Sequence, residues 1–353
     1  MKKIIVDLSM LKHINCGLGQ VALNYGKFFK QNYIEDENCQ IYLLLPKKMM
    51  GEFGSAVKYI ASNWWRKLFP FLIPKCDVWH SIYQLSNFRP FYNDSKLILT
   101  IHDFNFLYEK SEGKSKRYLR KIQKEIDRAD KIVCISDFTK TETERFAKLN
   151  GKNVEVIYNG VEQFDFNCAK QPDFIIKGKP FFFSIGQIKK KKNFHVLLPL
   201  MKMIPEKELY IAGKSGTTYA SDIQSVIHKE NITNVHLVGQ ITNEERVWMY
   251  KNCEAFLFPS LFEGFGLPVI EAMSFGKPVF TTEETSLKEI GGGHTIVWDN
   301  FDANDMKNVV DKNLKLFYSS PRNETENIEY ALLFSYEKHM TKYLDIYNDL
   351  MGL

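Results

Sequence analysis

The chain has 353 residues, of which 44% are hydrophobic, and 47 Lys and Arg residues against 42 Asp and Glu residues give it a net charge of +5. At about 150 residues per domain, this length predicts two domains with ample cores and excludes fibrous, disordered and mini-protein classes. So small a net charge excludes a dedicated nucleic-acid binder. The charge is nevertheless uneven, because residues 1–165 carry 26 basic and 19 acidic residues, a net +7. The first half is therefore expected to face an anionic neighbour.

The cysteines and the N-terminal segment indicate a cytoplasmic protein. The N-terminal apolar run is broken by Asp7 and Lys12, so it is expected to be a first strand and not a secretory leader. Nowhere does the sequence reach the roughly 18 to 20 apolar residues that cross a bilayer, so membrane contact would be peripheral. The six cysteines lie far apart, without metal-ligand or redox spacing, at Cys16, Cys39, Cys76, Cys134, Cys168 and Cys253.

The first half of the chain alternates short apolar runs with longer helical patterns. Fully apolar strands that alternate with helices form parallel sheets covered on both faces. This half therefore predicts a doubly wound parallel sheet. Its expected strands are residues 4–8, 40–45, 78–82, 97–103, 131–136 and 154–160.

The alternation pauses over residues 162–179, where prolines and a glycine indicate a linker. Six further strands are then expected at residues 181–186, 208–213, 235–239, 255–260, 278–282 and 294–299. The sequence thus predicts two Rossmann-like domains, at residues 1–165 and 178–335. Such domains bind ligands at the carboxyl ends of their strands, so chemistry is expected in the strand-to-helix loops that face a cleft.

The final segment, residues 336–353, predicts a helix that returns to the first domain. Its apolar side chains recur at helical spacing and form one stripe. The stripe comprises Tyr336, Met340, Tyr343, Leu344 and Tyr347.

The segment Pro259–Thr282, PSLFEGFGLPVIEAMSFGKPVFTT, carries the strongest local signal. A strand ends at Ser260, a loop with two glycines follows, and Pro268 suits the first turn of a helix. A glycine loop leading into a helix N-terminus offers backbone N–H groups to an anion such as phosphate. Two carboxylates stand eight positions apart in this segment, Glu263 in the loop and Glu271 in the helix.

Taken singly, Glu263 fits a solvated loop residue and Glu271 an early-helix acid favoured by the helix dipole. Together with the flanking glycines, however, the pair resembles the retaining glycosyltransferases of family 4, which have the two-domain GT-B architecture. The resemblance implies that Glu263 contacts hydroxyls of the donor sugar and that Glu271 binds the nucleotide ribose. It also implies that backbone between them meets the sugar and diphosphate, at Gly264, Phe265, Gly266 and Leu267.

A second match follows the linker, where SIGQIKKKKNFHVLLPLM resembles the basic segment that opens the first helix of the family's donor domain. Gly186 is then a donor-site glycine, and alignment on Asn193 places Lys192 and Lys191 in the phosphate-contacting positions. Lysines there would neutralise a leaving diphosphate. Since the family often has arginine where this chain has Gln187 and Lys191, which lysine contacts which oxygen stays open. A solvated basic loop is the alternative.

Three segments of the first half also resemble the family. LILTIHDFNF matches a strand followed by His-Asp, which implies that His102 lies at the reaction centre and that Asp103 shapes its loop; a purely structural histidine is the alternative. CGLGQVA meets a dinucleotide fingerprint only formally, because its first glycine stands too far from the strand. The family instead implies a glycine loop, Gly17 and Gly19, near the donor phosphate and acceptor. Ser136 is expected as a helix N-cap on the acceptor side.

The resemblance covers essentially the whole chain and implies that the second domain binds a nucleotide-activated sugar while the first presents an acceptor hydroxyl. Catalysis then stabilises negative charge on the leaving diphosphate, with retention of configuration. No acidic metal cluster is evident in the sequence, so no cofactor and no obligatory metal are expected. A glycoside hydrolase using the two glutamates would explain neither the lysines nor the two repeats. A non-catalytic nucleotide-sugar-binding protein stays open as the alternative function.

Basic and aromatic residues in the first half indicate an anionic membrane surface as a partner. Residues 63–75, NWWRKLFPFLIPK, interleave aromatic rings with cations, and residues 108–131 carry nine basic against five acidic residues. Internal burial of Trp64, Trp65 and Phe69 is the alternative for the first stretch, and a solvated helix for the second.

We therefore expect a cytoplasmic enzyme, peripheral on the inner membrane face, that modifies a glycan or lipid-linked acceptor in polysaccharide or lipopolysaccharide biosynthesis. A small soluble acceptor is the second candidate, and no nucleic-acid partner is expected. Backbone near Gly239 and Ile241 is expected to contact the base, which leaves GDP, UDP, ADP and dTDP donors open. The HDF and KKN segments mildly favour GDP-mannose.

Overall fold

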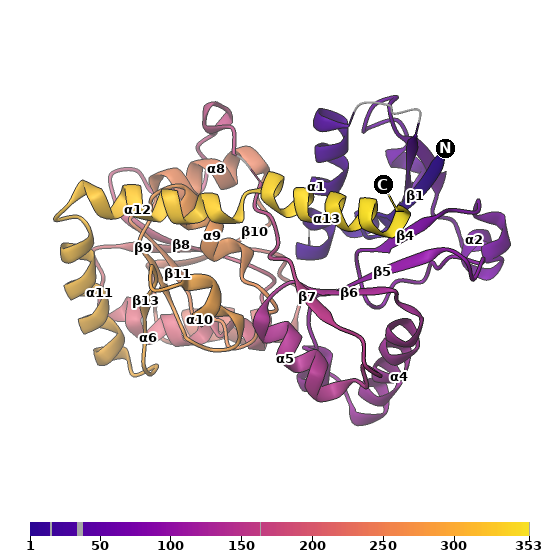
Figure 1. Ribbon diagram of the computed structural model, residues 1–353. Helices are drawn as coiled ribbons and strands as arrows, with labels where there is room; N and C mark the ends of the chain where they lie inside the picture. Colours follow the sequence, from indigo (N-terminus) through magenta and orange to yellow (C-terminus); the bar gives the residue numbers. More distant parts are fainter. Residues whose placement is uncertain (15, 34–37, 163, 353) are drawn as a thin grey trace. The chain divides into compact units, whose positions relative to one another are not determined.

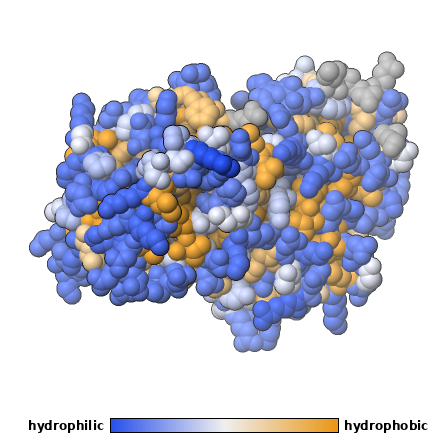
Figure 2. Space-filling model, turned by 60° about the vertical axis from the view of Figure 1, so that its left-hand side comes forward, coloured by the Kyte–Doolittle hydropathy of each residue, from blue (hydrophilic) through white to orange (hydrophobic). Residues whose placement is uncertain are grey.

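The structure is a computed structural model that describes residues 1–14, 16–33, 38–162 and 164–352. It contains two compact α/β units, one formed by residues 1–160 with 335–353 and the other by residues 161–334 (Figure 1). The second unit thus begins at Val161, ahead of the boundary expected at residue 178. On the face shown in Figure 2, hydrophilic residues cover most of the surface and hydrophobic residues emerge between them.

The first unit is built on a parallel sheet in the order β3-β2-β1-β4-β5-β6-β7. Its central strands are apolar and almost wholly buried, as a sheet covered on both faces requires. The edge strand β3 was not predicted, because its sequence KYIA is short and only Ile60 in it is buried. The strands are β1 Lys2–Asp7, β2 Cys39–Leu45, β3 Lys58–Ala61, β4 Val78–Ser81, β5 Lys96–Ile101, β6 Lys131–Cys134 and β7 Val154–Val156.

Helices flank this sheet, and the last of them comes from the C-terminal end of the chain (Figure 1). The α-helices are α1 Gly17–Asn32, α2 Trp64–Leu68, α3 Phe106–Glu109, α4 Glu112–Arg128, α5 Asp137–Phe146 and α13 Tyr336–Met351. Short 3₁₀ turns are η1 Ser9–His13, η2 Lys47–Met49 and η3 Pro70–Leu72. No helix in the described ranges is long and apolar enough to span a membrane.

The returning helix α13 packs against α1 and β4, as its apolar stripe predicts. Buried hydrogen bonds also fasten it, because Tyr347 OH lies 2.7 Å from His80 Nδ1 and Tyr343 OH lies 2.8 Å from Thr100 Oγ1. These bonds join α13 to β4 and β5. Of the predicted stripe Leu344 is half-buried, and the buried members are Tyr336, Met340, Tyr343 and Tyr347.

The second unit repeats the architecture with a parallel sheet in the order β10-β9-β8-β11-β12-β13. All six predicted strands form, although the last is only two residues long. They are β8 Phe181–Ile185, β9 Glu208–Ala212, β10 Val235–Gly239, β11 Ala255–Phe258, β12 Val279–Thr281 and β13 Ile296–Val297. In both sheets the strand order reverses beside the first strand, β1 or β8, which is the point where such sheets bind ligands.

The helices of the second unit cover its sheet in the same doubly wound manner (Figure 1). The α-helices are α6 Leu197–Lys202, α7 Thr218–Lys229, α8 Asn243–Asn252, α9 Leu267–Ser274, α10 Ser286–Gly291, α11 Ala303–Phe317 and α12 Pro321–Ala331. The 3₁₀ turns are η4 Phe166–Cys168, η5 Lys190–Lys192, η6 Phe194–Val196 and η7 Leu332–Phe334.

The segment 162–179 is predicted as a linker, but its described part, residue 162 and residues 164–179, is instead packed onto the second unit. The backbone N–H of Ile176 donates a hydrogen bond to Tyr210 OH at 3.0 Å. The ring of Phe164 lies 5.0 Å from that of Phe275 and 6.3 Å from that of Tyr250. The linker prediction was wrong because proline and glycine mark irregular backbone, which here covers a domain surface and does not bridge two domains.

Candidate active site

Three neighbouring strands of the second unit end on glycines. Gly186 follows β8, Gly213 follows β9, and Gly239 ends β10. The N–H of Gly213 donates to the carbonyl oxygen of Gly239 at 2.7 Å. A Cβ on Gly213 would stand 1.8 Å from the Gly186 carbonyl oxygen, so no other residue fits there. The predicted Gly186 and Gly239 thus share one edge with Gly213, which sequence reasoning missed although the repeated strand-end glycine was visible.

The lysine segment after β8 folds differently from the expectation. Lys190–Lys192 form the 3₁₀ turn η5, which ends at Asn193 in the left-handed conformation with φ 57°. The expected helix therefore does not open at the lysines; α6 begins only at Leu197, because the left-handed residue interrupts a right-handed helix. The turn places Lys192 beside Gly186, because a Cβ added to Gly186 would lie 3.1 Å from Lys192 Cε.

The structure brings together two of the predicted catalytic residues, Lys192 and Glu263. Lys192 Nζ lies 2.5 Å from Glu263 Oε1, and their side chains are only 11% and 13% exposed. The hydroxyl of Ser260, directly after β11, donates to the same carboxylate oxygen at 2.6 Å. The Lys192 ammonium also lies 4.6 Å from the centre of the Phe258 ring, a favourable cation–π position. A cation and an anion are thereby fixed at the carboxyl ends of β8 and β11.

Burial and charge act on this pair in opposite directions. Burial would raise the pKa of Glu263, but Lys192 and Lys191 outweigh it, and the pKa of this carboxyl is lowered below its ordinary value. Burial lowers the pKa of the Lys192 ammonium against the attraction of Glu263. Glu263 is therefore ionised at neutral pH and offers carboxylate oxygens that accept hydrogen bonds from hydroxyl groups.

The side chains of Thr285 and Ser286, which follow β12, fix the backbone of the loop that carries Glu263. Thr285 Oγ1 accepts a hydrogen bond from the N–H of Glu263 at 3.1 Å. Ser286 Oγ lies 3.0 Å from the carbonyl oxygens of both Glu263 and Phe265. In a trans peptide the C=O and N–H point in opposite directions, so the N–H of Gly266 is turned away from Ser286. Sequence reasoning missed both hydroxyls, because they stand more than twenty positions from the loop.

The start of α9 follows the predicted pattern. Gly266 is its N-cap, with φ 102°, and a Cβ there would stand 2.7 Å from Leu287 Cδ2. Pro268 lies in the first turn, as predicted. Gly264 and Phe265 are buried, and Leu267 is half-buried. A role of this backbone toward a ligand stays a prediction.

Glu271 has different partners from Glu263. Tyr250 OH donates to Glu271 Oε2 at 2.9 Å, and Arg246 Nη1 lies 3.4 Å from Glu271 Oε1. Arg246 also pairs with Glu162 at 3.2 Å. Burial would lower the pKa of Arg246, but Glu271, Tyr250 and Glu162 together raise it. Arg246 and Tyr250 were not predicted, although their i, i+4 spacing on α8 was the signal available.

In the first unit, His102 follows β5 and is 5% exposed. Its Nε2 lies 2.7 Å from the carbonyl oxygen of Ile82, and because a carbonyl can only accept, Nε2 carries the proton and Nδ1 is left as an acceptor. The backbone N–H of His102 donates to Gln84 Oε1 at 3.1 Å. Burial lowers the pKa of His102 to about 4, so the ring is neutral at pH 7.

The predicted acceptor-side residues lie next to His102. Asp103 Oδ1 accepts the N–H of Asn105 at 3.0 Å, so Asp103 shapes the loop as expected. Ser136 is the N-cap of α5, as predicted, and its Oγ accepts the N–H of Thr139 at 3.0 Å. Thr139 Oγ1 in turn donates to the His102 carbonyl oxygen at 3.2 Å. A role of Asp103 and Ser136 toward the acceptor stays a prediction.

The two glycines at the start of α1 differ in their surroundings. A Cβ on Gly19 would stand 2.1 Å from the backbone oxygen of His13, so Gly19 is needed for the packing of α1 on η1. A Cβ on Gly17 would meet nothing within 4 Å. Gly17 is therefore an open position at a helix N-terminus, and its role toward phosphate stays a prediction.

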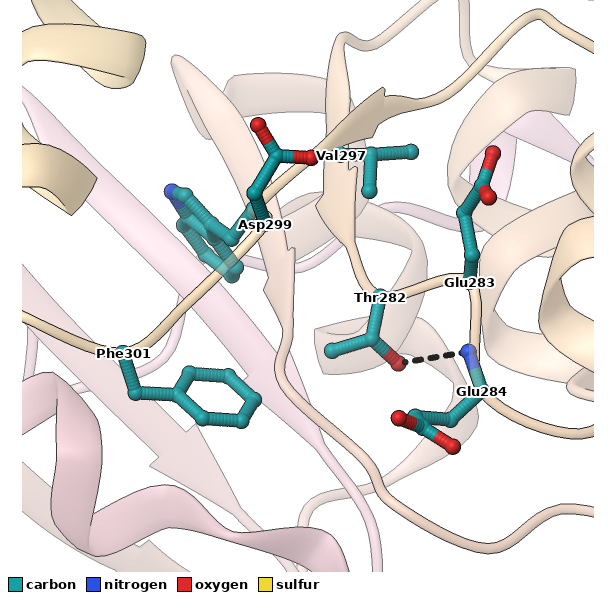
Figure 3. A pocket seen from close by; sticks show the side chains of 7 residues that line it. Thr282, Glu283, Glu284, Val297, Asp299 and Phe301 are labelled. Carbon is teal, nitrogen blue, oxygen red and sulfur yellow. Dashed lines mark hydrogen bonds between the residues drawn. The ribbon is translucent and has the colours of Figure 1, made fainter.

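A separate hollow of about 220 Å³ lies at the carboxyl ends of β12 and β13 (Figure 3). In Figure 3, Phe301 stands on one side of it and Glu283 and Glu284 on the other. No predicted donor-site residue lines this hollow, and its carboxylates would repel a diphosphate. Its lining consists of Thr282, Glu283, Glu284, Val297, Trp298, Asp299 and Phe301.

Two models of known protein families match the chain, one in each half. Residues 44–163 match the model "Glycosyltransferase Family 4", and residues 167–328 match "Glycosyl transferases group 1". An uncharacterised glycosyltransferase of Methanocaldococcus jannaschii is 26% identical over 264 residues, which cover 72% of this chain and 68% of that protein.

Two further relatives agree with these matches. The O-antigen chain mannosyltransferase RfbU of Salmonella typhimurium is 27% identical over 197 residues, 54% of this chain and about half (53%) of RfbU. The crystal structure of Anabaena HepE in complex with UDP-glucose superposes with a TM-score of 0.73 at 15% identity, covering 100% of both chains.

The two parallel-sheet units have the GT-B fold of glycosyltransferases, which confirms the predicted fold class. The chain belongs to the group 1 glycosyltransferases of family 4, as the sequence motifs indicate. This membership removes the glycoside hydrolase as a reading of the two glutamates.

Proposed function

We propose that this protein is a retaining glycosyltransferase that moves a hexose from a nucleotide-diphosphate sugar to a hydroxyl of a glycan or lipid-linked acceptor. The observation that carries the proposal is the buried Lys192–Glu263 pair, 2.5 Å apart at the carboxyl edge of the second sheet. Lys192 supplies positive charge for a leaving diphosphate, and Glu263 supplies acceptors for sugar hydroxyls.

The glycine-ended strands give the diphosphate a close approach to backbone, because side chains are missing at Gly186, Gly213 and Gly239. Glu271 is proposed to accept the ribose hydroxyls, while Tyr250 and Arg246 hold its carboxylate in place. A donor bound in this way leaves its anomeric carbon beside Glu263.

The proposed reaction breaks the bond between the anomeric carbon and the diphosphate oxygen, and forms a bond from the same carbon to the acceptor oxygen. The acceptor enters on the face that the diphosphate leaves, so the configuration is retained, and its proton passes to a diphosphate oxygen. His102 is proposed to hold a sugar hydroxyl through its unprotonated Nδ1. A neutral histidine suits this task, because its pKa of about 4 keeps it uncharged throughout the neutral range.

We also propose that transfer needs no divalent cation, since lysine can neutralise the diphosphate. In the part of the chain that the structure describes, no group of three or more His, Cys, Asp or Glu side chains is placed to hold a metal ion. Turnover that survives EDTA would agree with it, whereas turnover restored only by Mg²⁺ or Mn²⁺ would contradict it.

The donor and the place of action are further parts of the proposal. The relative named as an O-antigen chain mannosyltransferase favours mannose as the sugar and a glycan acceptor of the lipopolysaccharide type. GDP-mannose is the proposed donor, and the cytoplasm at the inner membrane face is the proposed place of action. The structure of HepE holds UDP-glucose, so a UDP-sugar is the second candidate donor. A small soluble acceptor is the remaining alternative.

A nucleotide-sugar screen tests the function. A donor that binds only the folded state raises the melting temperature in proportion to RT ln(1+[L]/Kd), so thermal shifts across GDP-, UDP-, ADP- and dTDP-sugars identify the donor. The donor found is then assayed for transfer and for slow hydrolysis. A donor that binds but is never turned over would favour the non-catalytic sugar-binding protein over the enzyme.

A further inference from the structure

We propose that the first unit docks on an anionic lipid bilayer through an aromatic ridge on α2, η3 and the loop that follows β4. This inference rests on the proposed function, because a bilayer holds a lipid-linked acceptor. Binding of the protein to a bilayer can nevertheless be measured without any sugar transfer. The ridge consists of the side chains of Trp64, Trp65, Phe69, Phe71, Phe91 and Tyr92. Figure 1 shows α2 at the outer edge of its unit.

The ridge is exposed and continuous. Trp64 and Trp65 are 56% and 51% exposed, which contradicts the alternative that these rings are buried internally. Adjacent rings of the ridge follow one another at centroid distances of 3.8, 6.0, 5.7, 6.1 and 5.3 Å. Leu68 and Leu72 are exposed beside them. A contiguous apolar patch of this kind marks an interaction surface, whereas single exposed apolar residues carry no such meaning.

Local hydrogen bonds hold the ridge in shape. Asn63 caps α2 by accepting the N–H of Arg66 at 3.0 Å. The Arg66 guanidinium donates to the carbonyl oxygens of Ala61 at 3.0 Å and Leu72 at 3.3 Å, which ties α2 to the strand before it and to the turn after it. The exposed rings therefore stand on a fixed backbone, so binding costs little additional ordering.

Cations of α2 and α4 lie close to one another near the tryptophan end of the ridge. Burial lowers the pKa of Lys121 on α4; the carboxylates of Glu125 and Asp7 act against this, while the positive charges of Lys67 on α2 and Arg117 on α4 lower the pKa further. Three cations from two helices therefore repel one another at this site. Anionic headgroups would relieve that repulsion.

Asp94 and Asp77 both act on Lys75 at the far end of the ridge. Lys75 there is paired with Asp94, and its ammonium lies 5.9 Å from the centre of the Tyr92 ring. The positive charge available to the partner is therefore that of Lys67 and Arg117, near the tryptophan end, because the half-buried Lys121 ammonium donates to the Leu85 carbonyl oxygen at 2.8 Å.

Composition and charge favour a bilayer over a second copy of the chain. Tryptophan and tyrosine beside lysine and arginine are typical of protein surfaces at the membrane–water boundary. In a two-fold dimer the same patch meets itself, so Lys67 and its neighbouring cations would face their own copies. A lipid surface avoids that repulsion and buries the rings.

Vesicle co-sedimentation of the full-length protein tests the proposal. Vesicles of equal parts phosphatidylglycerol and phosphatidylcholine should bind the protein, with a blue shift of tryptophan emission, and pure phosphatidylcholine should bind it much more weakly. The double substitution Trp64→Ser, Trp65→Ser should weaken binding about tenfold or more and abolish the shift. Lys67→Glu should weaken binding to the anionic vesicles alone.

The matched control is Leu332→Ser, Leu333→Ser, an apolar pair of similar exposure, 55% and 58%, in the second unit. This control should bind vesicles as the wild type does. The proposal is overturned if the wild type does not sediment with anionic vesicles, or if the tryptophan variant binds equally well. A wild-type dimer that the tryptophan variant turns into a monomer would assign the ridge to a second copy.

Donor hydrolysis in the absence of vesicles separates this inference from the proposed function. The tryptophan variant should hydrolyse the donor at the wild-type rate, since the ridge shares no residue with the donor site. Loss of vesicle binding with intact hydrolysis therefore bears on the ridge alone, and loss of hydrolysis in the wild type bears on the function alone.

Discussion

The side chain of Thr285 accepts a hydrogen bond from the backbone N–H of Glu263 at 3.1 Å. Thr285 does so from a backbone conformation, φ 57° and ψ −129°, that β-branched residues strongly avoid. Such strain costs on the order of 1–3 kcal/mol and persists where the surrounding structure holds it in place. A strained residue bonded to the Glu263 loop indicates that the position of this loop matters more than local stability.

Replacing Thr285 with glycine should therefore separate stability from activity. Thr285→Gly relieves the strained conformation but removes the hydroxyl, so the melting temperature should rise or stay level while kcat/KM for the donor falls about tenfold. Thr285→Ser keeps the hydroxyl and should retain most activity. A glycine variant with full activity would show that the hydroxyl does not position Glu263.

The Lys192–Glu263 pair should be sensitive to the loss of either charge. Glu263→Gln leaves Lys192 buried beside a neutral amide, so turnover should fall by a factor of about 10²–10³ and stability by a few kcal/mol. The exposed pair Lys202–Glu230 provides the control, since its side chains are 46% and 45% exposed. Glu230→Gln should change the free energy of unfolding by less than about 1 kcal/mol, measured by urea denaturation. Equal effects of the two substitutions would contradict the assigned role of Glu263.

The two glycines of α1 form a matched pair for mutation. Gly19→Ala should lower the free energy of unfolding by about 1–3 kcal/mol, because the new Cβ would overlap the His13 carbonyl oxygen. Gly17→Ala meets open space and should leave thermal stability nearly unchanged. If Gly17 approaches the donor phosphate, its alanine variant should still lose donor affinity in a binding titration. Unaltered affinity would remove Gly17 from the site.

Acid should destabilise the first unit through its buried histidines. Burial lowers the pKa of both His102 and His339 to about 4, whereas the unfolded chain binds their protons near pH 6.5. The unfolded state thus holds more protons between these values, so stability is full above about pH 6.5 and falls as the pH drops toward 4. The loss should approach about 3 kcal/mol per histidine.

Urea unfolding at pH 7 and pH 4.5 measures this loss. His339 also fastens α13, because its Nδ1 lies 2.7 Å from the Tyr158 carbonyl oxygen and its Nε2 lies 3.0 Å from Tyr25 OH. The variant His339→Gln should be less stable at pH 7 but should lose less on acidification. Identical pH dependence in wild type and variant would contradict the assignment.

The hydroxyl of Tyr250 should affect donor binding more than chemistry. Tyr250→Phe removes the bond to Glu271 at 2.9 Å but keeps the buried ring, so the KM for the donor should rise about threefold to tenfold with kcat little changed. Steady-state kinetics give both constants. A fall in kcat at constant KM would place Glu271 at the reaction centre instead of the ribose.

Much of the fold follows from the sequence because buried parallel strands are nearly uniform in composition. Runs such as QIYLLL and AFLFPS have no polar face and so predict strands covered on both sides. The edge strand β3 was not predicted, because Lys58 is exposed and only Ile60 is buried, which leaves almost no periodic hydrophobic signal. The linker prediction was wrong because glycine and proline report on backbone shape and not on what the backbone packs against.

The candidate site divides in the same way. Glu263, Glu271 and Lys192 stand out because they belong to short motifs, whereas Ser260, Thr285 and Arg246 become site residues only through contacts across the fold. Hydroxyl groups of this kind occur throughout the chain, and nothing local distinguishes Ser260 and Thr285, whereas for Arg246 the local signal was its i, i+4 spacing from Tyr250 on α8. The start of α6 shows a further limit of sequence-based prediction. The left-handed residue Asn193 interrupts the helix, so α6 begins after the lysines and not at them.

The central claim is that the Lys192–Glu263 pair serves the transfer of a sugar from a nucleotide. Its most direct test is turnover of the donor found in the thermal screen, with ¹H NMR of the product, for the wild type and Glu263→Gln side by side. We predict release of nucleoside diphosphate and a product with the donor's anomeric configuration in the wild type, and at least about a hundredfold slower release in the folded variant. Equal rates in the two proteins, or a product of inverted configuration, would contradict this account.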